Sequence, residues 1–218
     1  MELTDYRALL IDCDEVLFDR NSGIWTALQP LLENYPDTLS REQVLAEYDQ
    51  VMRELYPRFS ELGFSGLLCF AHRQLAERLG LKASWEEGMT FARSVCEWSL
   101  YEDAPGAMLY LRKFYRLLVY GDRDSADREA FCERLGIASE DFLSPTSKPL
   151  EDRDWLLRND LEPKDILLVC GSSADVSLAN GVCLIQRGCS EPDLSGTADF
   201  YINSMADLVT QHQQSLRR

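Results

Sequence analysis

The chain has 218 residues, 45% of them apolar, which is enough for one large domain or for a core that carries a sizeable insertion. Its 22 basic residues against 37 acidic ones give a formal net charge of −15, which repels nucleic acid and anionic membranes and argues against both as partners. The seven cysteines are odd in number, and the N-terminus has no basic segment leading into an apolar one. These features predict reduced thiols and a cytoplasmic protein.

The first predicted element is a buried strand over residues 8–11, which ends on two carboxylates two positions apart, Asp12 and Asp14. Like charges at a strand end repel each other unless a divalent cation or a proton relieves them, and carboxylate oxygens suit magnesium. A simpler reading is a strand-to-loop junction at which both acids merely contact water. The spacing of the two acids taken alone favours that simpler reading.

Helical spacing of apolar residues follows, from residue 24 to about residue 100. It predicts four helices, the last over residues 85–99. Capping boxes and helix-stopping residues agree with this block: Ser40 with Gln43, Ser84 with Glu87, Pro57 and Gly80.

Beyond residue 100, short apolar runs alternate with amphipathic segments. The runs predict strands over residues 117–120, 166–170 and 182–185, and the segments predict helices within 105–115, 126–135 and 151–158. This alternation predicts a parallel sheet with helices on both faces. The expected architecture is α/β, a Rossmann-like core of residues 1–17 and 101–218 with a helical cap, residues 18–100, inserted after the first strand. Ligands of such sheets bind beyond the carboxyl ends of the strands, where Asp12 and Asp14 lie.

Four stretches resemble the motifs of one family. "LLIDCDEVLFD" resembles the first motif of the haloacid dehalogenase (HAD) superfamily, hhhDxDGT, and "YRLLVYGDRDS" resembles the second. "SPTSKPLEDRD" is similar to the third motif, a Lys-Pro, and "LLVCGSSADVSLANG" to the fourth, GDSxxD; "ADFYINSMADL" is similar to the family's last strand and helix. The resemblance spans nearly the whole chain and implies a HAD-type fold, although fold alone does not fix activity.

The resemblance also implies roles for individual residues. Asp12 would attack phosphorus to form an aspartyl-phosphate, and Asp14 would protonate the leaving oxygen and then activate water. Lys148 would offset these carboxylates and bind the substrate anion, although a lysine before Pro149 also suits the start of a helix. The implied magnesium ligands are Asp12, Asp14 and Asp175.

The motifs depart from the family pattern at several positions. Glu15 and Val16 stand where the family has Gly and Thr, so a third acid appears and an orienting hydroxyl is lost. Gly121 replaces the hydroxyl residue of the second motif, a loss of about 10- to 150-fold in rate if nothing substitutes. Gly171 replaces the metal-binding Asp of the fourth motif, so Gly171→Asp is expected to tighten magnesium binding.

Four residues are candidates for substrate binding: Gly121, Asp122, Arg123 and Ser172. The guanidinium of Arg123 matches phosphate geometry and would substitute for the missing hydroxyl. Pairing of Arg123 with Asp122 or Asp124 is the simpler expectation, because the arginine lies between two acids.

The sequence favours a magnesium-dependent phosphomonoesterase that acts on a small phosphorylated metabolite, with activity weakened by these departures. Two alternatives stay open. One is a non-catalytic HAD-like protein that binds a ligand or partner; the other is a metal-independent hydrolase of the dehalogenase kind, which Ser172 and Ser173 favour and Asp14 opposes. Neither the substrate nor the oligomeric state follows from the sequence.

Overall fold

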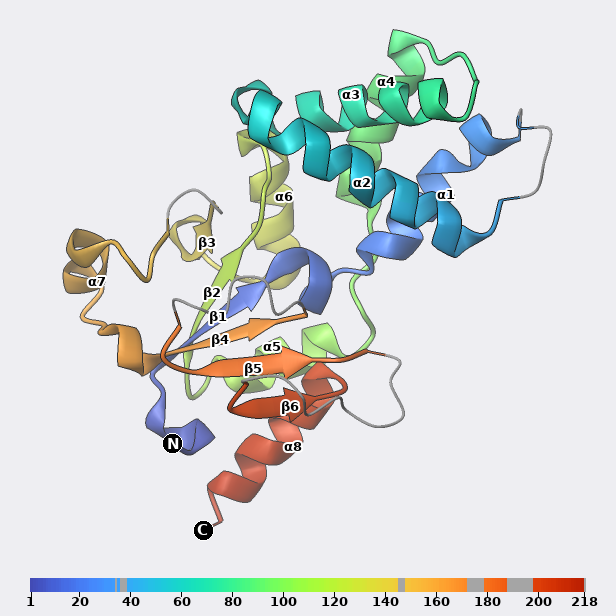
Figure 1. Cartoon of the computed structure of the whole chain (residues 1–218). Helices are drawn as coiled ribbons and strands as arrows, with labels where there is room; N and C mark the ends of the chain where they lie inside the picture. The colour runs from blue at the N-terminus through green and yellow to red at the C-terminus, as the bar shows by residue number, and fades with distance from the viewer. Residues whose placement is uncertain (34, 36–38, 145–147, 172–178, 188–197, 218) are drawn as a thin grey trace. The chain divides into compact units, whose positions relative to one another are not determined.

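The computed structural model describes residues 1–33, 35, 39–144, 148–171, 179–187 and 198–217 (Figure 1). The chain divides into two compact units. The α/β unit comprises residues 1–18, 100–122 and 132–218, and the helical unit comprises residues 19–99 and 123–131. Segment 123–131, which the sequence analysis grouped with the core, thus belongs to the helical unit. Within the described residues, no helix combines the length and apolar character needed to cross a membrane.

The α/β unit is built on one sheet of six parallel strands in the order β3-β2-β1-β4-β5-β6 (Figure 1). The strands are β1 (Ala8–Asp12), β2 (Arg116–Tyr120), β3 (Phe142–Leu143), β4 (Ile166–Cys170), β5 (Val182–Ile185) and β6 (Phe200–Ile202). The predicted α/β class with a parallel sheet is confirmed. Because β1 lies between β2 and β4, the residues that follow it are flanked by the ends of two other strands.

Both faces of the central strands are buried, which explains their uninterrupted apolar sequences. On one face, Leu10, Leu118 and Leu168 belong to a cluster with Leu156 of α7 (Arg153–Arg158). The other helices of this unit include α5 (Ala104–Leu111), which lies behind the sheet in Figure 1, and α8 (Met205–Ser215), which packs against α5. Strand β3 has only two residues, Phe142 and Leu143, which is too short for a pattern of apolar residues to predict it.

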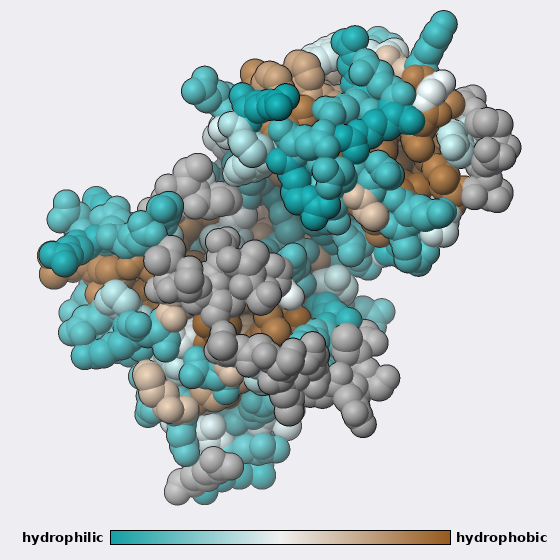
Figure 2. Space-filling model, in the orientation of Figure 1, coloured by the Kyte–Doolittle hydropathy of each residue, from teal (hydrophilic) through white to brown (hydrophobic). Residues whose placement is uncertain are grey.

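The helical unit contains α1 (Arg20–Leu32), α2 (Arg41–Phe59), α3 (Gly63–Arg78), α4 (Trp85–Arg93) and the beginning of α6 (Ser125–Leu135). Helix α3 packs against both α2 and α4 and buries Leu67, Leu68 and Leu75. The outward side of α2 is hydrophilic (Figure 2). The unit therefore has the amphipathic helices that the spacing predicted.

The ends of these helices follow the expected capping chemistry, with one exception. The Ser40 and Ser84 hydroxyls accept hydrogen bonds from the third backbone amide of α2 and α4, and both capping boxes are complete. Helix α3 ends just before Gly80, whose φ is +69°. The stop predicted at Pro57 is wrong, because Pro57 lies inside α2 and the helix ends at Phe59. A proline so close to the end removes one helical hydrogen bond without breaking the helix.

Candidate active site

Asp12 ends β1 at the carboxyl edge of the sheet, and residues Cys13–Leu17 form a single π-helical turn immediately after it. The Asp12 Oδ1 atom accepts hydrogen bonds from the backbone amides of Asp14, at 2.8 Å, and Glu15, at 3.1 Å. The carboxylate of Asp12 therefore caps the turn. Two amide donors hold it in a single orientation, as a nucleophile requires.

Arg187, two residues after β5, holds the far end of the same turn. Its Nη2 donates to the carbonyl oxygen of Val16 at 2.7 Å, and its Nη1 forms an ion pair with Asp103 at 3.1 Å. The guanidinium carbon lies 3.7 Å from the ring centroid of Tyr101. Arg187 lies outside the residues that define the four motifs, so the sequence gives no signal of its role. Its side chain therefore holds the turn that carries the acids through the Val16 carbonyl.

The carboxylate of Asp12 lies in a partly buried position and is repelled by the negative charges of Asp14 and Glu15. Burial, together with the charges of Asp14 and Glu15, raises the pKa of Asp12 from 3.8 to about 7, and the two backbone hydrogen bonds offset only part of this. Tyr120, which is level with Asp12 in the register of β1 and β2, is a further neighbour. Burial and the Asp12 carboxylate raise the pKa of the Tyr120 hydroxyl. A cation at this site would relieve the excess negative charge.

The two glycines that depart from the family pattern are both closely approached by side chains of the π-helical turn. A Cβ atom built on Gly121 would lie 2.8 Å from the Cβ of Cys13. A Cβ atom built on Gly171 would lie 2.8 Å from both the Cβ and the Oε2 of Glu15. Residues 13 and 15 thus fill the space that larger side chains at residues 121 and 171 would occupy. The Gly121 amide donates to the Leu143 carbonyl at 3.1 Å and serves the sheet.

Lys148 lies at the start of the segment before α7. Its Nζ forms an ion pair with Glu151 at 3.4 Å, and its side chain is 64% exposed. Among the described contacts, none joins Lys148 to Asp12. The backbone of Lys148 has a φ of +40°, an uncommon conformation for a residue other than glycine. Ser172 and Asp175 lie outside the described residues.

Arg123 is only 4% exposed and belongs to the helical unit. Its guanidinium carbon lies 4.4 Å from the ring centroid of Phe131, 5.2 Å from that of Phe64 and 5.5 Å from that of Trp98. Cation–π attraction of this kind is strongest where water is excluded. This position favours a packing role for Arg123 over the substrate-binding role inferred from its sequence context.

Asp124 also serves the helical unit. Its two carboxylate oxygens accept from the backbone amides of Phe64 and Ser65, each at 2.9 Å, at the beginning of α3. A carboxylate at this place satisfies donors that have no partner within the helix. Asp122 is half-buried and remains in the α/β unit.

The acids at the end of β1 fit a magnesium ion in their donor chemistry. Among the described residues, no three acidic, histidine or cysteine side chains converge as a ready metal cage. Magnesium rarely uses such a cage, because it keeps several waters and takes one or two carboxylates together with substrate oxygens. Asp12 and a neighbouring acid of the turn, Asp14 or Glu15, are carboxylates of the kind that magnesium takes.

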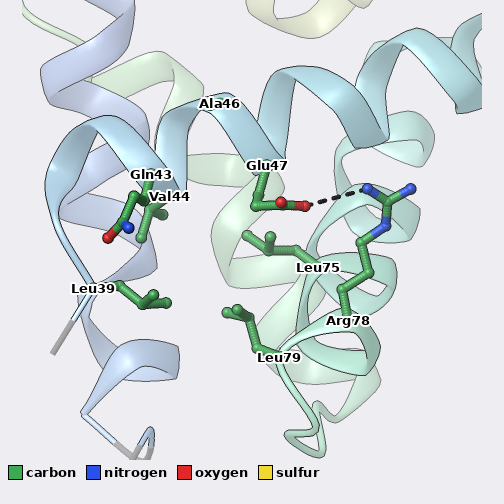
Figure 3. A pocket seen from close by; sticks show the side chains of 8 residues that line it. All are labelled: Leu39, Gln43, Val44, Ala46, Glu47, Leu75, Arg78 and Leu79. Carbon is green, nitrogen blue, oxygen red and sulfur yellow. Dashed lines mark hydrogen bonds and ion pairs between the residues drawn. The ribbon is translucent and has the colours of Figure 1, made fainter. Parts of the chain in front are cut away.

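A groove of about 610 Å³ lies in the helical unit, between α2 and α3 (Figure 3). Most of its walls are aliphatic, and its charged groups, Glu47 and Arg78, form an ion pair at 3.3 Å. It offers no nucleophile and no activated base, so the end of β1 stays the candidate for chemistry. The groove is lined by Leu39, Gln43, Val44, Ala46, Glu47, Leu75, Arg78 and Leu79.

No family model and no curated protein matches the chain. Solved structures match it over nearly its full length. The defluorinating L-2-haloacid dehalogenase Rha0230 is 15% identical with a TM-score of 0.73, and the match covers 97% of this chain and 98% of that one. The L-2-haloacid dehalogenase of Xanthobacter autotrophicus with chloropropionic acid covalently bound is 16% identical, with a TM-score of 0.71 and coverage of 95% and 98%.

A third match is the putative HAD-hydrolase YfnB from Bacillus subtilis bound to magnesium, at 15% identity, a TM-score of 0.65 and coverage of 94% and 97%. At such low identities these likenesses bear on the fold and leave the reaction open. The parallel sheet, the inserted helices and these matches agree with the motif resemblance. The chain has the HAD-like fold.

Proposed function

We propose that this chain is a hydrolase that uses Asp12 as its nucleophile to cleave a small phosphate monoester with the help of magnesium. One observation carries the proposal: the Asp12 carboxylate stands at the carboxyl edge of the sheet, oriented by two backbone amides, with Asp14 two residues further on. A nucleophile and an acid in this relation are what a two-step phosphoryl transfer requires.

In the first step, an oxygen of Asp12 attacks phosphorus, and the bond from phosphorus to the ester oxygen breaks. The leaving alcohol takes a proton from the carboxyl group of Asp14. In the second step, Asp14 takes a proton from water, the water oxygen attacks the phosphorus of the aspartyl-phosphate, and inorganic phosphate leaves. Asp12 returns to a free carboxylate and Asp14 to its acid form, so the cycle closes.

Other residues bind the ion and the substrate. Asp12, Asp14 and Asp175 are the proposed magnesium ligands, and the ion, when bound, offsets negative charge on the phosphoryl group and on the carboxylates. Lys148 and Ser172 are proposed to contact the substrate anion. The positive φ of Lys148 supports a functional role, because backbone strain of this kind concentrates at active sites.

Hydrolysis of p-nitrophenyl phosphate, with and without magnesium, tests the proposal. We expect slow turnover that requires magnesium, a loss of at least about 1,000-fold in Asp12→Asn and a loss of about 100-fold or more in Asp14→Asn. Asp160→Asn is the matched control, since the Asp160 side chain is 92% exposed and pairs with Arg7, which precedes β1 at the amino edge of the sheet. Acid quenching should trap a phosphoryl group on the peptide that carries Asp12. Equal, slow turnover by wild type and Asp12→Asn would instead favour a non-catalytic binding protein.

A second candidate is hydrolytic dehalogenation of a small 2-haloacid, in which Asp12 displaces halide from carbon and water then cleaves the ester. It is supported by the likeness in fold to L-2-haloacid dehalogenases, one of which holds chloropropionic acid covalently. Chloride release from 2-chloropropionate in the presence of EDTA, abolished by Asp12→Asn, would select this candidate over the phosphatase.

A further inference from the structure

Gly171 follows β4 directly, on the strand next to β1, and the Glu15 side chain lies over it. The Cβ position at residue 171 is 2.8 Å from Glu15 Oε2 and 3.4 Å from Glu15 Cδ. An aspartate at 171 would place its carboxyl carbon one bond, about 1.5 Å, beyond that Cβ. The Glu15 carboxylate therefore occupies the region that the carboxylate of the fourth motif would reach.

We propose that Glu15 supplies the carboxylate that the fourth motif lacks at Gly171, and that it binds the magnesium ion together with Asp12. The inference rests on the magnesium-dependent function proposed above. It reassigns one ligand from β4 to the turn after β1, so that two departures from the family pattern, an extra acid at residue 15 and a missing one at residue 171, compensate each other.

The turn that carries Glu15 is held on both sides of it. The Glu15 amide donates to Asp12 Oδ1 at 3.1 Å, and the next carbonyl, that of Val16, accepts from Arg187 at 2.7 Å. The backbone of Glu15 therefore has a fixed position, and its side chain extends toward β4. Glutamate has one more methylene than aspartate, which provides reach to the neighbouring strand.

The charges agree with a shared ion. Glu15 and Asp12 lie on one short turn, and the Glu15 amide donates directly to Asp12 Oδ1 at 3.1 Å. Two carboxylates in that relation repel each other without a cation and attract one together. Magnesium bound by two carboxylates, water and substrate oxygens is a common arrangement.

Calorimetric titration with magnesium chloride alone, without substrate, tests the inference. Glu15→Gln should weaken magnesium binding by about tenfold or more, since even groups outside the coordination shell change metal affinity by about 10- to 100-fold. Glu140→Gln is the matched control, because Glu140 is an exposed acid that precedes β3 and so lies toward the amino edge of the sheet. It should leave affinity unchanged. Urea unfolding confirms that each variant is folded.

A double variant that moves the carboxylate from residue 15 to residue 171 gives a second test, again by its affinity for magnesium. Glu15→Ala alone should bind magnesium weakly, and Glu15→Ala/Gly171→Asp should recover affinity to within about threefold of wild type, because the second carboxylate is restored. Unchanged affinity in Glu15→Gln would overturn the assignment of Glu15, and so would a wild type that binds no magnesium. Loss of hydrolysis in Asp12→Asn is measured separately, so the role of Asp12 can stand while that of Glu15 fails.

Discussion

Two segments leave neighbouring strands at the same edge of the sheet and use similar residues in different ways. Residues 13–17 follow β1, residues 121–124 follow β2, and Asp12, the last residue of β1, is level with Tyr120 in the register. In the first segment, burial and the neighbouring acids together raise the pKa of Asp12. In the second, Arg123 and Asp124 are taken up by packing and capping within the helical unit. The burial of a charged side chain and the groups that it contacts, more than its place in a motif, thus determine whether it can act in catalysis.

The largest expected change in stability comes from Arg123. Arg123→Ala should lower the free energy of unfolding by about 3 kcal/mol, because it removes a buried cation from three aromatic rings and leaves a cavity. Arg73→Ala, at a side chain 69% exposed, should cost less than about 0.5 kcal/mol. Urea denaturation measures both. An Arg123→Ala variant of normal stability with weakened phosphate binding would show that residues 121–124 serve the site after all.

Whereas Arg123 is expected to stabilise the fold, Asp12 is expected to lower the free energy of unfolding by an amount that depends on pH. In metal-free buffer the folded state holds the Asp12 proton up to a pKa of about 7, against 3.8 as the ordinary value. The folded state thus binds more protons than the unfolded state between these values, so stability falls as pH rises from about 4 to about 7.

Asp12→Asn removes this loss while its side-chain oxygen still accepts from the same amides. Its advantage over wild type should grow by roughly 2 kcal/mol between pH 5 and pH 8, as measured by urea denaturation at both values. Asp160→Asn should differ from wild type by less than about 0.5 kcal/mol at either pH. A constant difference between Asp12→Asn and wild type would mean that burial and the neighbouring acids do not raise the pKa of Asp12.

Asp124 offers a smaller test of the second segment. Asp124→Ala should cost about 1 kcal/mol, because the Phe64 and Ser65 amides lose their acceptors at the start of α3. Asp124→Asn keeps one acceptor oxygen and should cost less. Turnover of p-nitrophenyl phosphate should stay within about twofold of wild type if Asp124 acts only as a cap. A much larger fall in turnover in a stable Asp124→Asn variant would instead place this acid in the active site.

Lys148 should give the smallest change in stability. Its pair with Glu151 is 3.4 Å long and largely exposed, so Lys148→Gln should change the free energy of unfolding by less than about 0.5 kcal/mol. Lys148→Gly should stabilise slightly, because glycine accepts a φ of +40° without strain. If Lys148 binds the substrate anion, both variants lose turnover despite their stability. Full activity in both would remove it from the site.

Much of the fold was predictable because its signals are local. The buried runs that became β1, β2, β4 and β5 were located to within one residue, since parallel strands covered on both faces show uninterrupted apolar sequences. The capping boxes at Ser40 and Ser84 likewise depend on residues three apart. The short strand β3 has no such signal, and the extension of α2 past Pro57 depends on contacts beyond the proline.

The candidate site was predictable only in part. The position of Asp12 and Asp14 at a strand end follows from the apolar run before them. The contacts of Cys13 with Gly121 and of Glu15 with Gly171 join residues more than 100 positions apart, and a single sequence holds no local trace of them. The sequence predicts that Gly171→Asp tightens magnesium binding. The structure predicts that this single substitution must first displace Glu15, since the new Cβ would lie 2.8 Å from the Cβ of Glu15.

The close approach of Glu15 to Gly171, and of Cys13 to Gly121, also bears on how this site can diverge. Each pair has room for only one large side chain. A larger residue at one position of a pair is therefore expected to occur with a smaller residue at the other. Homologues with an acid at the position of residue 171 should carry glycine or alanine at that of residue 15. Homologues with serine or threonine at the position of residue 121 should carry a repositioned or smaller neighbour at that of residue 13. Covariation between positions 15 and 171 would indicate that an acid on the residue after β4 was exchanged for an acid on the turn after β1.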